Sequence, residues 1–182
     1  MPKLTFRLQI ACEARCRILR FGYGGSVVNQ LPKHPHRLPV ILPLEVGVIY
    51  YVTCCTHDRR RVFTTEARVA LALGELRETS RRLARLVGGV VVMLDHVHFF
   101  CSPMDRDGHV LPSFVGAWRA AVTRRLSASG IHGSVWQKSF FDHMLRSDES
   151  YGNKWEYVRR NPDRAGLNDF RRWFEIDPIR FR

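Results

Sequence analysis

The hydrophobic pattern of the chain predicts alternating strands and helices. Residues 46–56 (VGVIYYVTCCT) are rich in β-branched and aromatic side chains, which pack well on a pleated surface, so they predict a strand. From Thr65 to Val87 the apolar residues recur at helical spacing, with Ser80 interrupting the stripe. We expect this helix to end at Gly88-Gly89, because glycine is a common helix stop.

Two further strands and a second helix are expected next. The runs VVVM (90–93) and HVHFFCS (96–102) predict strands joined by a tight turn at Leu94-Asp95. A helix that starts near Pro112-Ser113 is expected to end in the stop signal SASG (127–130). Its buried side is expected to hold Phe114, Trp118, Ala121 and Leu126.

The last two elements complete the order β-α-β-β-α-β followed by a helix. Residues 135–145 (VWQKSFFDHML) predict a fourth strand, and Ser147 suits the N-cap of a final helix. That helix is expected to end at Asn161, since Pro162 cannot continue it. The order indicates an α+β fold of the ferredoxin-like kind, in which a four-stranded antiparallel sheet carries both earlier helices on one face.

Charge narrows the range of partners. The 182 residues contain 29 Lys plus Arg and 17 Asp plus Glu, a net charge of +12. The hydrophobic share of 45% and the charged share of 25% are ordinary for a globular protein, which excludes wholesale disorder. No apolar run approaches the roughly 18 residues of a spanning helix. A polyanion is therefore the expected partner: nucleic acid first, and an anionic membrane surface second.

The two ends differ from the middle of the chain. We expect residues 1–33 to be a basic, poorly ordered arm, residues 34–167 to be the folded domain, and residues 168–182 to be a short basic tail. A start codon assigned too far upstream is the alternative explanation of the first segment. The basic residues of the arm, set against the single acid Glu13, are Lys3, Arg7, Arg15, Arg17, Arg20 and Lys33.

The cysteines do not indicate a disulfide framework. Their number is odd, no signal peptide precedes them and no CxxC is present, which predicts reduced thiols in a cytoplasm. A zinc knuckle made of Cys12, Cys16, His34 and His36 is a weak alternative, because the C-x3-C spacing and the intervening Pro35 fit poorly.

His96-Val97-His98 is the first candidate for chemistry. Alternate residues of a strand share a face, so both imidazoles are expected to point the same way, opposite to Val97 and Phe99. Two adjacent imidazoles can serve as ligands of one divalent ion. The alternative is that both rings are only hydrogen-bonded. Phe100 stands where a histidine-triad hydrolase needs its third histidine, which excludes that class.

The second candidate lies on the expected last helix. Tyr151, Trp155 and Val158 form its apolar stripe. Tyr157 lies about 200° around the helix from Trp155, outside that stripe, and Asn161 follows one turn later on the face of Tyr157. The helix alone is equally compatible with a surface tyrosine and an ordinary Asn terminus before proline.

Together with the positive charge of the chain, these residues suggest chemistry on a phosphodiester. A tyrosine can attack a phosphodiester when a divalent ion polarises the phosphate. His96 and His98 offer neutral nitrogen donors for the ion, and the amide oxygen of Asn161 offers a third ligand without adding negative charge. A basic surface would hold the DNA backbone.

Two segments resemble a known family of DNA-processing enzymes. MLDHVHFF (93–100) resembles the Met-Pro-(Asn/Asp)-His-Val-His-hydrophobic signature of HUH single-tyrosine transposases. Residues 136–167 (WQKSFFDHMLRSDESYGNKWEYVRRNPDRAGL) resemble the tail of the REP-associated tyrosine transposases in their Trp-Gln, Asp-His, Tyr-(Ile/Val)-x-x-Asn-Pro and Gly-Leu landmarks. The match runs from about Pro35 to Leu167. Leu94 replaces the usual Pro, and neither residues 1–33 nor the ending after Leu167 matches the family.

The resemblance implies a ferredoxin-like domain that cuts single-stranded DNA beside short REP-like hairpins and can later rejoin it. Tyr157 would be the nucleophile that forms a 5′-phosphotyrosine. His96, His98 and Asn161 would hold Mg²⁺ or Mn²⁺, and no nucleotide cofactor would be needed because the covalent step conserves bond energy. Both monomers and dimers occur among such proteins. The rival interpretation is a non-catalytic hairpin-binding protein derived from such a transposase. A metal-dependent hydrolase of small substrates lacks the expected carboxylates.

DNA contacts are assigned more loosely. The residues expected to contact phosphate are Arg119, Arg124, Arg125, Lys138, Arg159 and Arg160, each of which is alternatively a solvated surface charge. Trp136 and Phe140 can stack on unpaired bases, although core packing is the more common role of such residues. His143 is a landmark of the family without a role that the sequence defines.

Overall fold

The computed structural model describes residues 48–104, 110–145 and 148–179. The expected basic arm, the cysteine–histidine knuckle, the start of the first expected strand and the Ser147 cap lie outside these ranges. The elements in chain order are β1 (Ile49–Cys55), the 3-10 helix η2 (His57–Arg59), α2 (Glu66–Arg82), β2 (Arg85–Val92), β3 (His96–Pro103), α3 (Leu111–Ala128), β4 (Phe141–Leu145), α4 (Asp148–Arg159), α5 (Asn161–Arg164) and β5 (Trp173–Glu175). The predicted β-α-β-β-α-β order is therefore confirmed.

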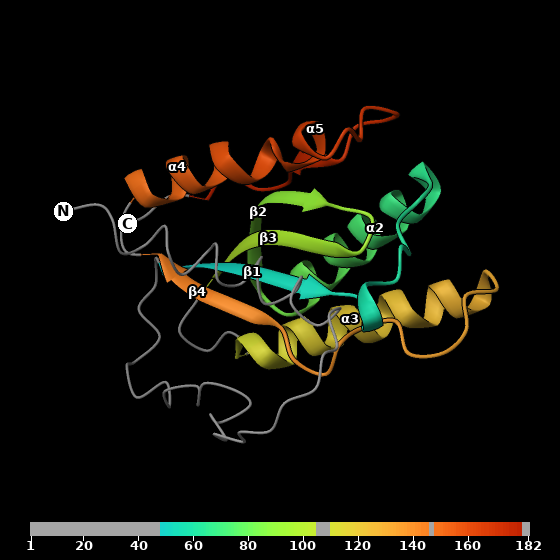
Figure 1. Ribbon diagram of the computed structural model, residues 1–182. Helices are drawn as coiled ribbons and strands as arrows, with labels where there is room; N and C mark the ends of the chain where they lie inside the picture. The colour runs from blue at the N-terminus through green and yellow to red at the C-terminus, as the bar shows by residue number, and fades with distance from the viewer. Residues whose placement is uncertain (1–47, 105–109, 146–147, 180–182) are drawn as a thin grey trace, which may run out of the picture. The chain divides into compact units, whose positions relative to one another are not determined.

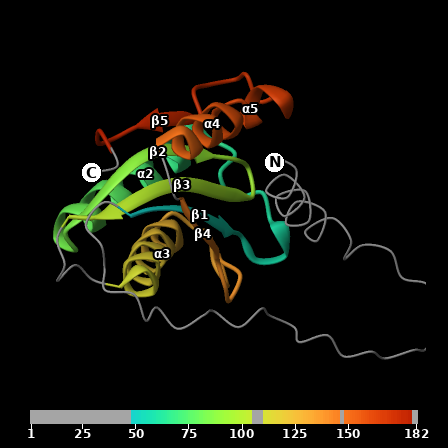
Figure 2. The same ribbon diagram turned by 90° about the vertical axis from the view of Figure 1, so that its left-hand side faces the viewer.

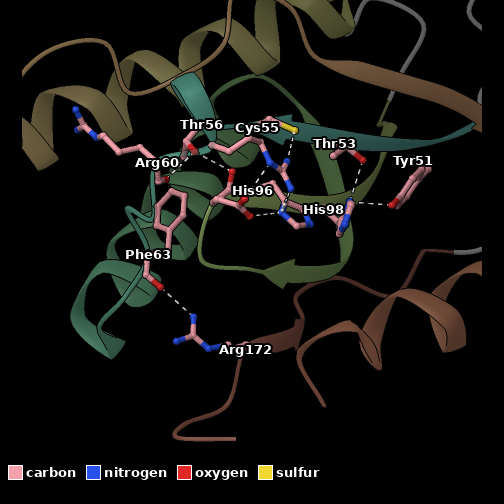
Figure 3. Close-up of polar contacts among 11 residues, drawn as sticks. Tyr51, Thr53, Cys55, Thr56, Arg60, Phe63, His96, His98 and Arg172 are labelled. Atoms are coloured by element: carbon pink, nitrogen blue, oxygen red, sulfur yellow. Dashed lines mark hydrogen bonds and ion pairs between the residues drawn. The ribbon is translucent and has the colours of Figure 1, made fainter. Parts of the chain in front are cut away.

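The strands of the described residues form one antiparallel sheet in the order β4-β1-β3-β2-β5. The α+β fold class is confirmed, but the expected number of four strands is wrong. The fifth strand, β5, lies in the segment expected to be a tail and pairs with Gly89–Val91 of β2. The buried Arg172 just before β5 donates to the Phe63 carbonyl at 3.0 Å (Figure 3). Backbone pairing, Arg172 and Asp177, which accepts from the Val87 N–H at 2.9 Å, hold the segment on the otherwise open edge of β2.

Helices cover both faces of the sheet, as Figures 1 and 2 show: α2 and α3 lie on one face, and α4 and α5 lie over the other. Strand alternation supplies each face with its own apolar cluster. Val97 and Phe99 of β3 pack with Trp118 of α3 on the first face. Phe100 packs with Trp155 of α4 on the second. The predicted placement of the two earlier helices on one face is confirmed.

The first helix ends earlier than expected. The hydroxyl of Thr65 caps its start by accepting a hydrogen bond from the backbone N–H of Arg68. The helix then stops at Arg82, and Ala84 in the following turn has a positive φ of 48°. Gly88-Gly89, expected to be the helix stop, instead lies buried inside β2.

The two glycines of β2 allow α4 to approach the sheet closely. A Cβ atom on Gly89 would lie 2.6 Å from the Trp155 ring, and one on Gly88 would lie 2.9 Å from the Tyr151 hydroxyl. Both distances are shorter than van der Waals contact permits. The glycines are therefore required by the packing of α4, which no local pattern in β2 reveals.

We expect Gly89→Ala to destabilise the protein by about 1–3 kcal/mol, because the added methyl group forces the Trp155 ring and α4 away from the sheet. The matched control is Gly74→Ala on α2, where an added Cβ meets nothing within 4 Å. That change is expected to stabilise the helix by about 0.5–1 kcal/mol. Urea unfolding of both variants measures the difference, and equal stabilities would contradict the proposed close approach.

The predicted fourth strand and the predicted last helix are both shorter in the structure. The strand expected from residue 135 begins at Phe141, and Trp136 forms only an isolated bridge with Thr56. The helix expected to reach Asn161 ends at Arg159. Pro162 lacks the N–H that a continuing helix needs, and it is instead accommodated in the first turn of the short helix α5.

The second helix follows the prediction closely, since Phe114, Trp118, Ala121 and Leu126 of α3 are all buried.

No helix within residues 48–104, 110–145 and 148–179 combines the length and the apolar character needed to cross a bilayer. Within the described residues, Cys54, Cys55 and Cys101 form no disulfide bond.

Candidate active site

His96 and His98 lie side by side on β3, on the sheet face that α4 covers. In the register with β1 they stand opposite Cys55 and Thr53. The centroids of the two imidazole rings are 4.6 Å apart, and Val97 between them packs into the cluster of the opposite face. The prediction that both rings share one face is confirmed.

Two hydroxyl groups from β1 hold the His98 ring. Its Nδ1 lies 2.8 Å from the Tyr51 hydroxyl oxygen and 2.9 Å from Thr53 Oγ1 (Figure 3). Only 7% of the residue is exposed. Burial, followed by the positive charges of His96, Arg59 and Lys154, lowers the pKa of His98 well below its usual value. The ring is therefore neutral near pH 7, as a metal ligand must be.

A carboxylate holds the His96 ring. Its Nδ1 lies 2.7 Å from Asp95 Oδ1, while the other oxygen of Asp95 pairs with Arg59 Nε at 2.9 Å. Burial opposes ionisation of Asp95, but the hydrogen bond to His96 and the charges of His96 and Arg59 together lower its pKa. Because an ionised carboxylate only accepts hydrogen bonds, we assign a proton to Nδ1 of His96, so that the lone pair of the neutral ring is on Nε2.

The donors of the two histidines fit a divalent ion. The Nδ1 atom of each ring contacts a protein side chain. Neither Nε2 atom has a hydrogen-bond partner in the described part of the chain. A carboxylate or hydroxyl behind a ligating imidazole is the usual arrangement at metal sites, because it orients the ring and selects the tautomer. Within the same residues no three His, Cys, Asp or Glu side chains converge on one point, so the histidine pair needs a third donor of another kind.

Helix α4 carries Tyr157 over this face. Lys154 Nζ lies 5.0 Å from the centroid of the Tyr51 ring, whose hydroxyl contacts His98. Tyr157 follows Lys154 by three residues and therefore lies on the same side of α4. It is half-buried and packs against the apolar cluster that contains Tyr51. Arg164 covers its ring at 4.1 Å and donates to its backbone carbonyl.

Asn161 is placed differently from the prediction. It is the first residue of α5, so it does not share one helix with Tyr157. Its side-chain amide makes no hydrogen bond to any described residue, including the two histidines, and the residue is partly exposed. The structure therefore brings the two histidines together and carries Tyr157 to their face of the sheet, while the amide of Asn161 has no partner among the described residues.

The basic residues expected to contact DNA fall into two groups. Arg119 is held within the protein, since its guanidinium contacts the carbonyls of Gln137 and Lys138 and stacks on Trp136. Burial lowers the pKa of Arg119. The others lie at the surface: Arg125 lies 3.6 Å from Glu75, Arg159 and Arg160 both pair with Glu156, and Arg124 and Lys138 are exposed.

The candidate stacking residues pack into the core instead. Trp136 is only 6% exposed and contacts the rings of Phe63 and Trp118. Phe140 is half-buried against the same cluster. The alternative interpretation of both residues, core packing, is the one that the structure favours.

Several site residues were not recognised in the sequence. Tyr51, Thr53, Arg59, Asp95 and Lys154 surround the histidine pair. Asp95, directly before the pair, carried the only local signal, since the others arrive through strand register and helix packing. The same register gives the unexplained landmark His143 a place, because it stands on β4 opposite Tyr51.

Comparison with known proteins supports the fold. No protein-family model matches the sequence. The chain is 24% identical over 84 residues to an uncharacterized protein of Haemophilus influenzae. That match covers 41% of this chain and 47% of the other, so the chain spans about half the length of that curated relative.

Two solved structures are similar. One is a REP-associated tyrosine transposase bound to a REP hairpin, with 17% identity, a TM-score of 0.61 and coverage of 77% of this chain and 81% of that one. The other, provisionally named as a transposase, is from Deinococcus radiodurans, with 22% identity, a TM-score of 0.47 and coverage of 62% and 88%. The chain thus has the fold of the REP-associated tyrosine transposase that its sequence resembles.

Proposed function

We propose that this protein is a transposase-type endonuclease and strand transferase that cleaves and rejoins single-stranded DNA beside hairpins. The observation that carries this proposal is the pair of imidazoles, held through Nδ1 and open at Nε2, on the sheet face covered by the helix of Tyr157. The fold shared with a REP-associated tyrosine transposase supports it.

In the proposed reaction the Tyr157 hydroxyl oxygen attacks the phosphorus of one phosphodiester and loses its proton to solvent. The bond from phosphorus to the 3′ oxygen breaks, and that oxygen leaves as a 3′-hydroxyl after taking up a proton. The result is a 5′-phosphotyrosine. One phosphoester replaces another, so the energy for rejoining is retained and no nucleotide cofactor is required.

His96 and His98 would bind Mg²⁺ or Mn²⁺ through Nε2, and the unengaged amide of Asn161 is the proposed third ligand. When bound, the ion would supply Lewis acidity to the scissile phosphate. Asp95, Tyr51 and Thr53 hold the two rings in orientation. His98 stays neutral because of its burial.

The proposed partner is DNA with single-stranded segments next to REP-like hairpins. The net charge of +12 favours a polyanion, and the similar transposase structure contains a REP hairpin. Of the basic residues named above, the exposed Arg124 and Lys138 are the best placed for phosphate contacts. A bacterial cytoplasm and a monomer or homodimer belong to the same proposal.

A non-catalytic hairpin-binding protein is the second candidate. One observation favours it: Arg164 lies directly over the Tyr157 ring, so this arrangement of α4 and α5 does not leave the tyrosine uncovered. The two candidates differ in their need for a metal ion, because binding alone does not require one.

A denaturing gel tests the proposal. Wild-type protein is mixed with labelled single-stranded oligonucleotides that contain REP-like hairpins from its own genome, in Mn²⁺ or in chelator. We expect a protein–DNA adduct that survives SDS in Mn²⁺ and is absent in chelator. Hairpin binding without an adduct, across oligonucleotides that vary the sequence flanking the hairpin, would favour the non-catalytic binder.

A further inference from the structure

A basic feature adjoins the turn that carries Arg59. It is an open cleft of about 330 Å³ between the segment that follows η2, the first turn of α2 and the turn that follows α3. The cleft is lined by Arg60, Arg61, Val62, Arg68, Gly130, Ile131 and His132. None of these residues belongs to the set that the sequence suggested for DNA binding.

The cleft has positive charge without counter-charge. No carboxylate lines it, and none of its arginines pairs with a carboxylate in the described residues. Arg60 donates to the carbonyl of His132 at 3.3 Å. Arg68 donates to the Val62 carbonyl at 3.2 Å and to Thr64 Oγ1 at 3.1 Å. These neutral acceptors orient the guanidiniums but leave their charge uncompensated, which favours an anion in the cleft.

The backbone links this cleft to the candidate active site. Asp58 and Arg59 have positive φ values of 50° and 56°, which non-glycine residues rarely adopt in succession. Thr56 holds the turn in place, since its single hydroxyl proton is shared between the carbonyls of Arg60 at 2.8 Å and Asp95 at 2.9 Å.

The strained turn divides three consecutive arginines between two sites. Arg59 contacts Asp95 and His96, whereas Arg60 and Arg61 line the cleft. Figure 3 shows the Arg60 side chain pointing away from the two histidines. The turn therefore places one guanidinium at the histidine pair and the next two in the cleft.

We propose that this cleft binds one backbone phosphate of the DNA strand that is cleaved, at a position next to the scissile phosphate. The inference rests on the proposed function and adds a docking point to it. The chemistry recognised is a phosphate anion held by paired guanidiniums, so the test must separate a nucleic-acid phosphate from a free phosphate ion.

The experiment measures binding of the full-length protein to a labelled hairpin oligonucleotide with single-stranded flanks, in chelator, over a range of salt concentrations. The variants are Arg61→Gln, whose side chain makes no hydrogen bond in the described residues, and Arg60→Gln/Arg61→Gln. The control, Arg77→Gln/Arg81→Gln, removes two exposed charges from α2 outside the cleft. Melting curves establish that each variant is folded.

We expect the Arg60→Gln/Arg61→Gln variant to bind the oligonucleotide about tenfold more weakly at moderate salt. Its slope of log affinity against log salt should fall by about 0.7, the value for one lost phosphate contact on a single strand. Arg61→Gln alone should show part of both effects, and the control should keep the wild-type slope.

Any of three results would overturn the inference. If the double variant binds DNA like the control while wild-type protein still forms the metal-dependent adduct, the cleft proposal fails and the proposed function stands. If the double variant loses only its interaction with inorganic phosphate, measured by calorimetry, the cleft is a site for the free ion. An absence of any DNA binding by the wild type would overturn both proposals together.

Discussion

Tyr157→Phe is expected to abolish the covalent protein–DNA adduct while leaving the fold and hairpin binding intact. The substitution removes only the phenolic oxygen, which is the proposed attacking atom. The ring that remains still packs against the apolar cluster under α4 and still lies beneath Arg164. The loss should therefore be complete on the denaturing gel and nearly absent in a melting curve or a binding assay.

The same helix offers a matched control. Tyr151→Phe makes the identical chemical change two turns earlier, where the hydroxyl lies against β2. This variant should still form the adduct, with a stability loss of about 1 kcal/mol, because it removes the hydrogen bond between the Tyr151 hydroxyl and the backbone of Gly89. An adduct that persists in Tyr157→Phe would show that another residue is the nucleophile.

His96→Ala is expected to lower the rate of adduct formation at least about 100-fold, because it removes a proposed metal ligand rather than a group behind one. It should also remove measurable Mn²⁺ binding in calorimetry. His96 is the better position for this test than His98. Truncating the buried His98 would leave the hydroxyls of Tyr51 and Thr53 without their common partner, at a cost of about 1–3 kcal/mol in stability.

At His96 the neighbouring ion pair between Asp95 and Arg59 survives the substitution, so unfolding should change little. His57→Ala is the control, since the side chain of this exposed histidine pairs with its neighbour Asp58 and with no other side chain in the described part of the chain. It should retain both Mn²⁺ binding and adduct formation. Wild-type affinity for Mn²⁺ in His96→Ala would contradict the metal site, whatever the effect on cleavage.

The local sequence pattern was sufficient to predict features that depend on residue spacing within one helix or one strand. Periodicity located α2 and α3, and alternation placed both imidazoles on one face of β3. These features depend on neighbours within a few residues along the chain, and such neighbours are visible in the sequence.

Contacts between distant segments were decided only by the tertiary structure. The pair Gly88-Gly89 predicted a helix stop. In the structure the pair lies in a buried strand, where Trp155 packs closely against it. The segment expected to be a tail forms β5. It pairs with the edge of β2, and the buried Arg172 side chain anchors it.

Some features of the candidate site were likewise determined by the sequence, and others by the tertiary structure. The sequence alone determined the identity of its chemical groups, namely two imidazoles on one face, a tyrosine and an amide on a late helical segment, and a strongly basic chain. The tertiary structure decided what surrounds them: the hydroxyls behind His98, the Asp95–Arg59 pair behind His96, and the cleft of Arg60 and Arg61. Orientation, burial and charge at a site come from cross-strand register and helix packing, which bring together residues about 40 to 50 positions apart that have no local signature.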